Sequence, residues 1–190
     1  EAMTMAGLEV EEVSSVAPAF SGVVVARVLS VRDDENSDHL HICQVDVGEG
    51  GEPLQIVCGA PNVREGILVP CAKIGAVLPG NFTIKKAKMR GEVSMGMLCS
   101  ARELGITEDH TGLWILPEGL TVGEDIRKAC HLDDKKIEIK LTPNRGDALS
   151  LIGVARDLHA ITGAPLTLPE MPDVPANSDT KIDIKIEAPD

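Results

Sequence analysis

The sequence predicts an α+β protein that contains a small antiparallel β-barrel and a separate α/β domain. Between residues 20 and 116, short apolar runs alternate with Gly, Pro, Asn and Asp, which is the pattern of short strands joined by turns. After residue 123 the spacing of the apolar residues changes to that of one strand and a long helix. With 190 residues, of which 43% are hydrophobic, the chain is long enough to bury a core.

The barrel strands are predicted from six segments that are rich in Val, Ile and Leu and lie between turn residues. These segments are residues 23–31, 40–47, 54–58, 68–74, 82–89 and 113–116. Five or six short strands are typical of an OB-type barrel. Ser100 and Glu103 have the spacing of a capping box, so a short helix is expected to begin at Ser100 and to close one end of the barrel.

The rest of the chain predicts a brief helix over 125–130 and a strand over 136–141. Asp147 is expected to cap a longer helix that ends at Gly163. The apolar residues of this helix recur at helical spacing and are Leu149, Ile152, Ala155, Leu158 and Ile161.

The last 25 residues predict two further features. Four prolines between residues 165 and 177 indicate an extended linker. Isoleucines alternate with charged residues over 182–186, which is the pattern of a strand with one apolar face. We expect 166–190 to be a Pro-rich linker followed by the first strand of a domain that this chain lacks.

The composition limits the classes of function. The chain has 30 acidic and 18 basic residues, a net charge of -12, so any RNA binding is expected from a local patch. Five cysteines without C-x-x-C spacing indicate neither a disulfide framework nor a zinc site. No apolar run approaches the roughly 20 residues that cross a bilayer. We expect a cytoplasmic protein without membrane contact.

Two stretches of the barrel region resemble the tRNA-binding OB module that several synthetase-associated proteins share. The first joins Ile-Val-Cys-Gly-Ala-Pro-Asn-Val at 56–63 to Ile-Gly-Ala-Val-Leu-Pro-Gly at 74–80. The second combines Lys-Met-Arg-Gly-Glu at 88–92, Gly-Met-Leu-Cys-Ser at 96–100 and Glu-Leu-Gly at 103–105.

The flanks of the module narrow the resemblance. Met-Thr-Met-Ala-Gly-Leu-Glu-Val at 3–10 precedes it, and Leu-Thr-Pro-Asn-Arg-Gly-Asp at 141–147 with Gly-Val-Ala-Arg at 153–156 follows it. In this order the segments are similar to the N-terminal region of bacterial-type phenylalanyl-tRNA synthetase β chains, and the similarity covers nearly the whole sequence.

The resemblance implies that the OB-type barrel, residues 20–123, is inserted into one small discontinuous α/β domain made of 1–19 and 124–165. It also implies an (αβ)2 enzyme whose α subunit activates phenylalanine with ATP and Mg²⁺. A later β-chain domain of that family edits mischarged tyrosine. Neither active site is expected in these residues, so we assign the chain no catalytic residue, metal or cofactor and predict no catalytic activity for it alone.

The densest basic cluster supplies the main candidates for RNA contact, which are Lys85, Lys86, Lys88 and Arg90. Strand geometry would place Lys86, Lys88 and Arg90 on one face, where they could contact phosphates. The alternative is a solvated strand edge that lysines protect from aggregation.

The resemblance implies three further RNA-contact candidates, Asn36, His39 and Ser94. The family loop reads His-Pro-Asn-Ala-Asp-Lys-Leu, whereas residues 34–40 read Asp-Glu-Asn-Ser-Asp-His-Leu, so His39 replaces a lysine. The alternative for Asn36 and Asp38 is a turn in which they bond to their own backbone.

Two catalytic or metal sites are also conceivable from spacing. His39, His41 and Cys43 alternate along one predicted strand, but such a line spans about 13 Å, too far for one ion. Cys99 with Asp109 and His110 could form a nucleophile and its base, yet a small buried thiol explains Cys99 equally well.

The segment around Asn144, Arg145 and Asp147 allows two interpretations. Pro-Asn-Arg-Gly followed by Asp is typical of a turn and a helix cap, and Arg145 could instead form a salt bridge or contact RNA.

The leading functional hypothesis is a non-catalytic tRNA-binding and assembly portion of a phenylalanyl-tRNA synthetase β subunit, with phenylalanine tRNA and the α subunit as partners. One alternative is a stand-alone OB module that binds tRNA or protein. Another is a hydrolase that uses Cys99.

Overall fold

The computed structural model describes residues 1–34, 37–109 and 111–188, and the chain divides into two compact units. The larger unit is Glu11–Glu138, and the smaller one combines Glu1–Val10 with Ile139–Asp190. The predicted domain boundaries stay a prediction, because compactness alone does not define a domain.

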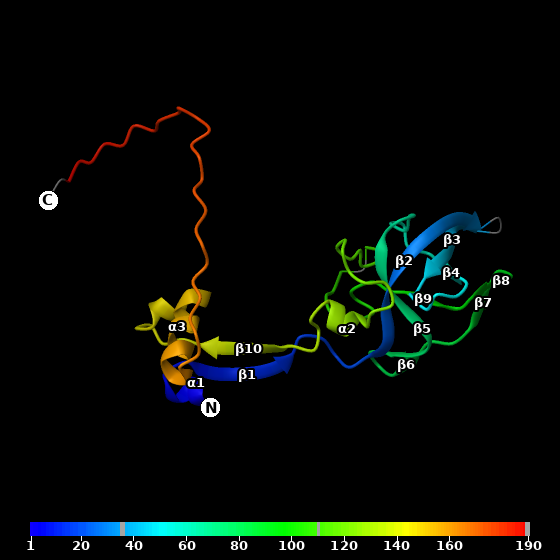
Figure 1. Cartoon of the computed structure of the whole chain (residues 1–190), viewed down its shortest axis with the longest axis horizontal. Coiled ribbons are helices and arrows are strands. Elements are labelled where there is room, and N and C mark those ends of the chain that lie inside the picture. Colours follow the sequence, from blue (N-terminus) through cyan, green and yellow to red (C-terminus); the bar gives the residue numbers. More distant parts are fainter. Residues whose placement is uncertain (35–36, 110, 189–190) are drawn as a thin grey trace. The chain divides into compact units, whose positions relative to one another are not determined.

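Antiparallel strands are the main regular elements of the larger unit (Figure 1). One sheet has the order β4-β3-β2-β5-β6, and β9 pairs with β5 beside it. A hairpin of β7 and β8 forms a separate two-stranded sheet. The strands are β2 (Ser21–Asp34), β3 (Ser37–Asp46), β4 (Leu54–Cys58), β5 (Leu68–Leu78), β6 (Phe82–Thr83), β7 (Ala87–Met89), β8 (Glu92–Ser94) and β9 (Gly96–Leu98).

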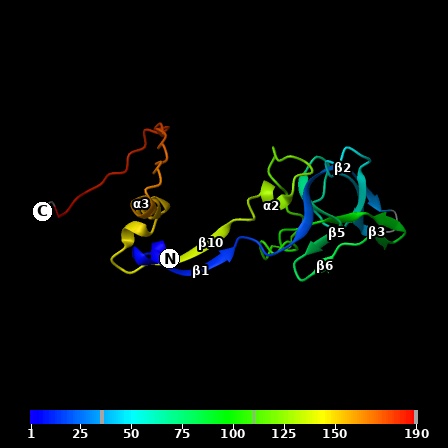
Figure 2. The ribbon, with the colours of Figure 1, turned by 60° about the horizontal axis from the view of Figure 1, so that its bottom comes forward.

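The sheet curls on itself (Figure 2). Strand β4 thereby contacts β8 and β9. The Met95 N–H donates to the Gln55 carbonyl at 2.9 Å. The Ser94 hydroxyl accepts from the Val57 N–H at 3.1 Å and donates to the Gly96 carbonyl at 2.8 Å. The strands therefore follow each other around a nearly closed antiparallel barrel, which confirms the predicted fold class.

Apolar side chains cover both faces of β2. Because successive residues of a strand point to opposite faces, Val23 and Val25 belong to one buried cluster and Val24 and Val28 to another. The first cluster also holds Leu68, Leu104 and Ile126, and the second holds Val45, Ile56 and Val69. Such double burial explains why β2 is nearly continuously apolar rather than alternating.

A short helix, α2 (Ile126–Ala129), confirms the helix predicted over 125–130. The Asp125 carboxylate caps it by accepting from the Arg127 N–H at 2.8 Å. The Arg127 guanidinium lies 4.8 Å from the centre of the Phe20 ring and donates to the Pro18 carbonyl. These contacts hold the segment that enters the barrel against the segment that leaves it.

The helix predicted to begin at Ser100 is a turn instead. The capping box does form, with the Glu103 N–H donating to the Ser100 hydroxyl and the Ser100 N–H to the Glu103 carboxylate. Gly105, at φ +67°, then takes the left-handed conformation and ends the structure after one turn.

Two other strand predictions are only partly right. Residues 82–89 form two short strands, because the chain leaves the sheet between Thr83 and Ala87. Residues 113–116 make a single bridge, between Leu116 and Leu68, and no strand.

The remaining elements are α1 (Ala2–Met5), β1 (Glu9–Ser15), β10 (Lys135–Lys140), a 3₁₀ turn at Gly146–Ala148 and α3 (Leu151–Thr162). Strands β1 and β10 pair in a two-stranded sheet. None of the helices in the described residues is long and apolar enough to cross a membrane.

Helix α3 confirms the longest predicted helix, but its cap is different from the prediction. Ser150, not Asp147, accepts from the Gly153 N–H at 3.0 Å, because the Asp147 carboxylate bonds to Arg145. Gly163, at φ +70°, ends the helix as expected.

The strand predicted over 182–186 is absent. Residues 163–188 form neither helix nor strand. A strand is stabilised by backbone bonds to a neighbour, and no described segment pairs with these isoleucines, so the apolar alternation alone does not produce one.

Candidate nucleic-acid interface

Lys85, Lys86, Lys88 and Arg90 are all exposed in the structure, but Lys86, Lys88 and Arg90 do not share one strand face as predicted. Lys85 and Lys86 lie between β6 and β7, and only Lys88 lies in a strand, opposite Val93. Arg90 has φ +48°, a left-handed conformation, at the tip of the β7–β8 hairpin. The four cations therefore follow a connecting segment and a hairpin, which we call the basic hairpin (residues 85–94).

The one acidic side chain of the basic hairpin is bound elsewhere. Glu92 accepts from the Arg32 guanidinium at 2.9 Å and from the Gln55 amide at 3.0 Å. In the described part of the chain, Lys85, Lys86 and Lys88 have no ion-pair partner. Three ammonium groups are thus available to an anion although the whole chain is acidic.

A groove of about 630 Å³ opens beside the basic hairpin. Met89 of the hairpin and Leu40 of β3 both line the groove. Each directly follows a candidate RNA contact in the sequence, Met89 after Lys88 and Leu40 after His39, so both candidates lie near the groove. Its floor is mostly apolar, and its polar side chains come from Ser100, Arg102 and Glu103. A surface of this kind can bind unpaired bases or an apolar segment next to a source of positive charge.

Asn62 fixes two walls of this groove. Its amide nitrogen donates to the Leu113 carbonyl at 3.0 Å, and its amide oxygen accepts from the Leu113 N–H at 2.8 Å. A side chain on Gly112 would collide with this amide. Asn62, Arg102 and Gly112 were not predicted as site residues, although Asn62 is part of the Gly-Ala-Pro-Asn signature.

The other predicted RNA contacts, His39, Asn36 and Ser94, differ in exposure or lie outside the described residues. His39 is exposed, and its N–H donates to the Ser37 hydroxyl at 3.4 Å. Asn36 lies outside the described residues. Ser94 is only 2% exposed, and its hydroxyl is fully engaged by Val57 and Gly96 in closing the barrel. This burial leaves Ser94 no surface for RNA, so its role is architectural.

The cysteines do not have the properties of nucleophiles. Cys99 is completely buried, and burial raises the pKa of its thiol. Burial likewise raises the pKa of the Cys43 and Cys71 thiols to about 12. His110 lies outside the described residues. A thiol that stays protonated and inaccessible cannot attack a carbonyl, so the structure gives no support to a Cys99 hydrolase.

The predicted histidine and cysteine line does not converge. The His41 Nδ1 lies 2.9 Å from the Asp33 carboxylate, whereas Cys43 points into the barrel core. Among residues 1–34, 37–109 and 111–188, no group of three His, Cys, Asp or Glu side chains could hold a metal ion.

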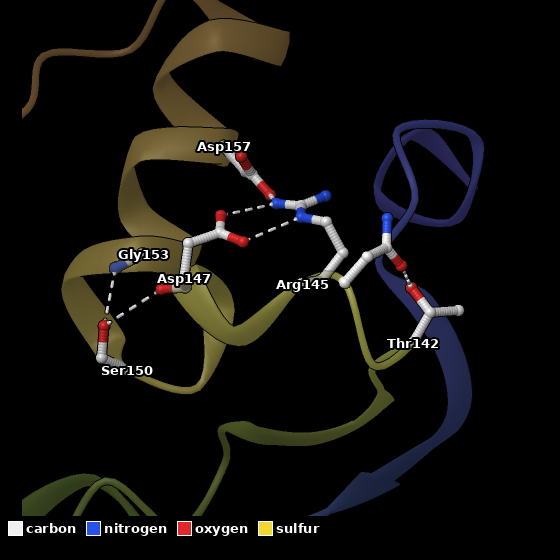
Figure 3. A network of polar contacts seen from close by, with 7 residues as sticks. Thr142, Arg145, Asp147, Ser150, Gly153 and Asp157 are labelled. Carbon is white, nitrogen blue, oxygen red and sulfur yellow. Dashed lines mark hydrogen bonds and ion pairs between the residues drawn. The ribbon is translucent and has the colours of Figure 1, made fainter.

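In the small unit, Arg145 bonds to two carboxylates (Figure 3). Its guanidinium donates to both Asp147 oxygens, at 3.1 and 3.0 Å, and to Asp157 of α3. These hydrogen bonds raise the pKa of Arg145 and lower the pKa of Asp147. Thr142 donates to the Asn144 amide oxygen at 2.6 Å in the turn before it. The structure thus contains the turn of the first interpretation, and it also contains the salt bridge that the second interpretation allowed for Arg145.

Curated relatives match almost the whole chain. It is 57% identical to the "Phenylalanine--tRNA ligase beta subunit" of Cupriavidus pinatubonensis and 56% identical to that of Ralstonia nicotianae, over 99% of this chain in both cases. The chain spans 24% of the length of each of these relatives.

A solved structure resembles part of the chain, and a family model matches the barrel. The crystal structure of a MetRS-related protein from Pyrococcus horikoshii has a TM-score of 0.41 and 24% identity, over 55% of this chain and 87% of that one. The family model described as "Putative tRNA binding domain" matches residues 23–125, more than half of the chain. The chain therefore belongs to this family of tRNA-binding domains.

Proposed function

We propose that this chain is the tRNA-binding and assembly portion of a phenylalanine-tRNA ligase beta subunit. The observation that carries the proposal is the 56–57% identity to such subunits, which extends over 99% of the chain and not only over the barrel. Identity across both units indicates that the barrel and its flanks belong together in the relatives.

The basic hairpin is the proposed contact with tRNA. Lys85, Lys86 and Lys88 are exposed and have no ion-pair partner in the described residues, so they can neutralise backbone phosphates. His39 and Arg102 lie near the same groove and extend this surface. Because the chain as a whole has a charge of -12, binding by the chain alone is expected to be weak and to fall steeply with salt.

The chain contributes no catalytic group in this proposal. Attachment of phenylalanine, with ATP and Mg²⁺, belongs to an α subunit that assembles with the beta subunit in an (αβ)2 enzyme in the cytoplasm. In this proposal the barrel is of the OB type, and its role is to hold tRNA and to support that assembly.

Two measurements test the proposal. Titration of the 190-residue chain with phenylalanine tRNA is expected to give weak binding that disappears as salt increases, because the contacts are to phosphates. Incubation with phenylalanine, ATP, Mg²⁺ and tRNA is expected to give no charged tRNA. Tight, salt-insensitive binding, or charging by the chain alone, would contradict the proposal.

A further inference from the structure

Large apolar side chains in and just before helix α3 are exposed, and three of them, Leu149, Ile152 and Leu158, belong to the helical pattern predicted from the sequence. Leu151 is 90% exposed, and Leu149, just before the helix, is 79% exposed. Ile152 and Leu158 are 38% and 36% exposed. We call these four residues the α3 stripe. Leu151 and Leu158 are seven residues apart, so they lie on one side of the helix two turns apart.

Another side of α3 is already covered. Gly153 is buried, and a side chain there would collide with the Asp147 carbonyl. Asp157, one turn further, bonds to Arg145 (Figure 3). Helix α1 also packs against α3. The α3 stripe lies on a different face from Gly153 and Asp157, and on it Leu151 remains 90% exposed while Ile152 and Leu158 remain 38% and 36% exposed.

A helix of this length is not expected to be stable without packing. Isolated helices of 12 residues are marginal in water, and most helical stability in proteins comes from burying an apolar face. In the described residues of the small unit, the only buried apolar side chains are Leu8 and Ala148. Burial of the α3 stripe would supply what the small unit lacks.

We infer that the α3 stripe docks on a part of the same polypeptide that lies outside these 190 residues; this inference rests on the proposed function. The relatives are long enough, since the chain spans only 24% of them. The stripe has four large side chains, whereas a stable interface between separate proteins takes roughly 20–30 residues a side. A patch this small suffices within one polypeptide, where the effective concentration is high.

Amide hydrogen exchange tests the inference, in the 190-residue chain and in the full-length beta subunit that contains it. Protection of the α3 amides is expected to be at least about tenfold higher in the full-length subunit, the factor expected from burying one leucine. Leu151→Asp should remove this gain. It should leave α3 in the short chain unchanged, because Asp is well accepted at the first helical position. Met171→Asp, at a side chain 91% exposed in the extended segment, is the control and should change neither.

The other outcomes overturn the inference. Equal protection in both proteins means that nothing beyond residue 190 covers the stripe. Protection that appears only when the α subunit is added assigns the stripe to a separate protein, and a dimer of the short chain that Leu151→Asp dissociates assigns it to a second copy. If the natural reading frame does not encode a beta subunit longer than these 190 residues, the proposed function itself fails. That result differs from equal protection in the two proteins.

Discussion

In the larger unit, buried apolar side chains cover both faces of β2, whereas Leu8 and Ala148 are the only buried apolar side chains in the described part of the small unit. The small unit is held instead by a helix cap at Ser150, a left-handed glycine at Gly163 and the bonds of Arg145. Burial is worth more than exposed polar contacts, so the barrel should be the stable part of the chain. The stability of the small unit therefore depends on a few local contacts and on what the unit packs against.

The largest expected effect is a truncation in the barrel core. Leu68→Ala removes a completely buried side chain and should lower the free energy of unfolding by about 4 kcal/mol. Leu151→Ala, at a side chain 90% exposed, should change it by less than about 0.5 kcal/mol. Urea unfolding followed by fluorescence measures the loss at Leu68, since Trp114 is the only tryptophan and packs against the barrel core, and amide exchange in α3 measures the change at Leu151. Similar losses from the two variants would contradict the contrast between the units.

The next effect comes from a close approach between two glycines of the larger unit. Gly48 has φ +76°, and a Cβ there would lie 2.6 Å from the Gly123 Cα. Gly48→Ala should therefore cost about 3 kcal/mol, from backbone strain and overpacking together. Gly50 has φ +68° but nothing within 4 Å of a Cβ, so Gly50→Ala should cost only about 1 kcal/mol. If Gly48→Ala and Gly50→Ala lower the free energy of unfolding equally, as monitored by Trp114 fluorescence, the close approach of Gly48 to Gly123 does not contribute to the cost.

A smaller and more local effect is expected at the α3 cap. Ser150→Ala removes the acceptor of the Gly153 N–H and should destabilise α3 by about 1 kcal/mol. Amide exchange in α3 should become faster, while the Trp114 transition stays in place. Ser178→Ala, in the extended segment, should change neither. A shift of the barrel transition by Ser150→Ala would mean that the two units unfold together.

The smallest expected effect is a pH dependence of the stability of α3. The pKa of Asp147 is below its usual value of 3.8 in the fold, because Arg145 donates to its carboxylate. A lowered pKa means that this stabilisation is complete above about pH 4 and is lost as the pH falls through the lowered value. Arg145→Gln should return the pKa of Asp147 towards 3.8 and weaken α3 most at neutral pH. An NMR titration of the Asp147 carboxyl in both proteins measures this, and an unchanged pKa in the variant would refute it.

Much of the barrel could be predicted from the sequence, because apolar alternation and turn residues are local signals. Segment 54–58 was predicted with its exact bounds. The three-residue strands β8 and β9 could not be predicted, since they are held by contacts across the barrel such as Met95 with Gln55. The predicted cap residue of α3 was wrong, because the Asp147 carboxylate bonds to Arg145 instead, and the spacing of residues does not reveal this competing partner.

The candidate interface was predictable only in part. The cluster of Lys85, Lys86 and Lys88 is evident from composition, but its path out of the sheet depends on where β6 ends. The groove beside it is built from separate segments, and Asn62 joins two of them across 51 residues of sequence. Such a site requires the closed barrel before its parts can be recognised.

The most direct test of the account is the salt dependence of tRNA binding by charge variants. Lys86→Ala with Lys88→Ala removes two exposed cations of the basic hairpin, and Lys128→Ala with Lys136→Ala removes two exposed cations elsewhere in the larger unit. Each lost phosphate contact should reduce the slope of log affinity against log salt by about 1. We predict a slope reduced by about 2 for the hairpin pair and an unchanged slope for the control pair. Equal slopes for all three proteins, or the larger reduction in the control, would contradict the assignment of tRNA binding to the basic hairpin.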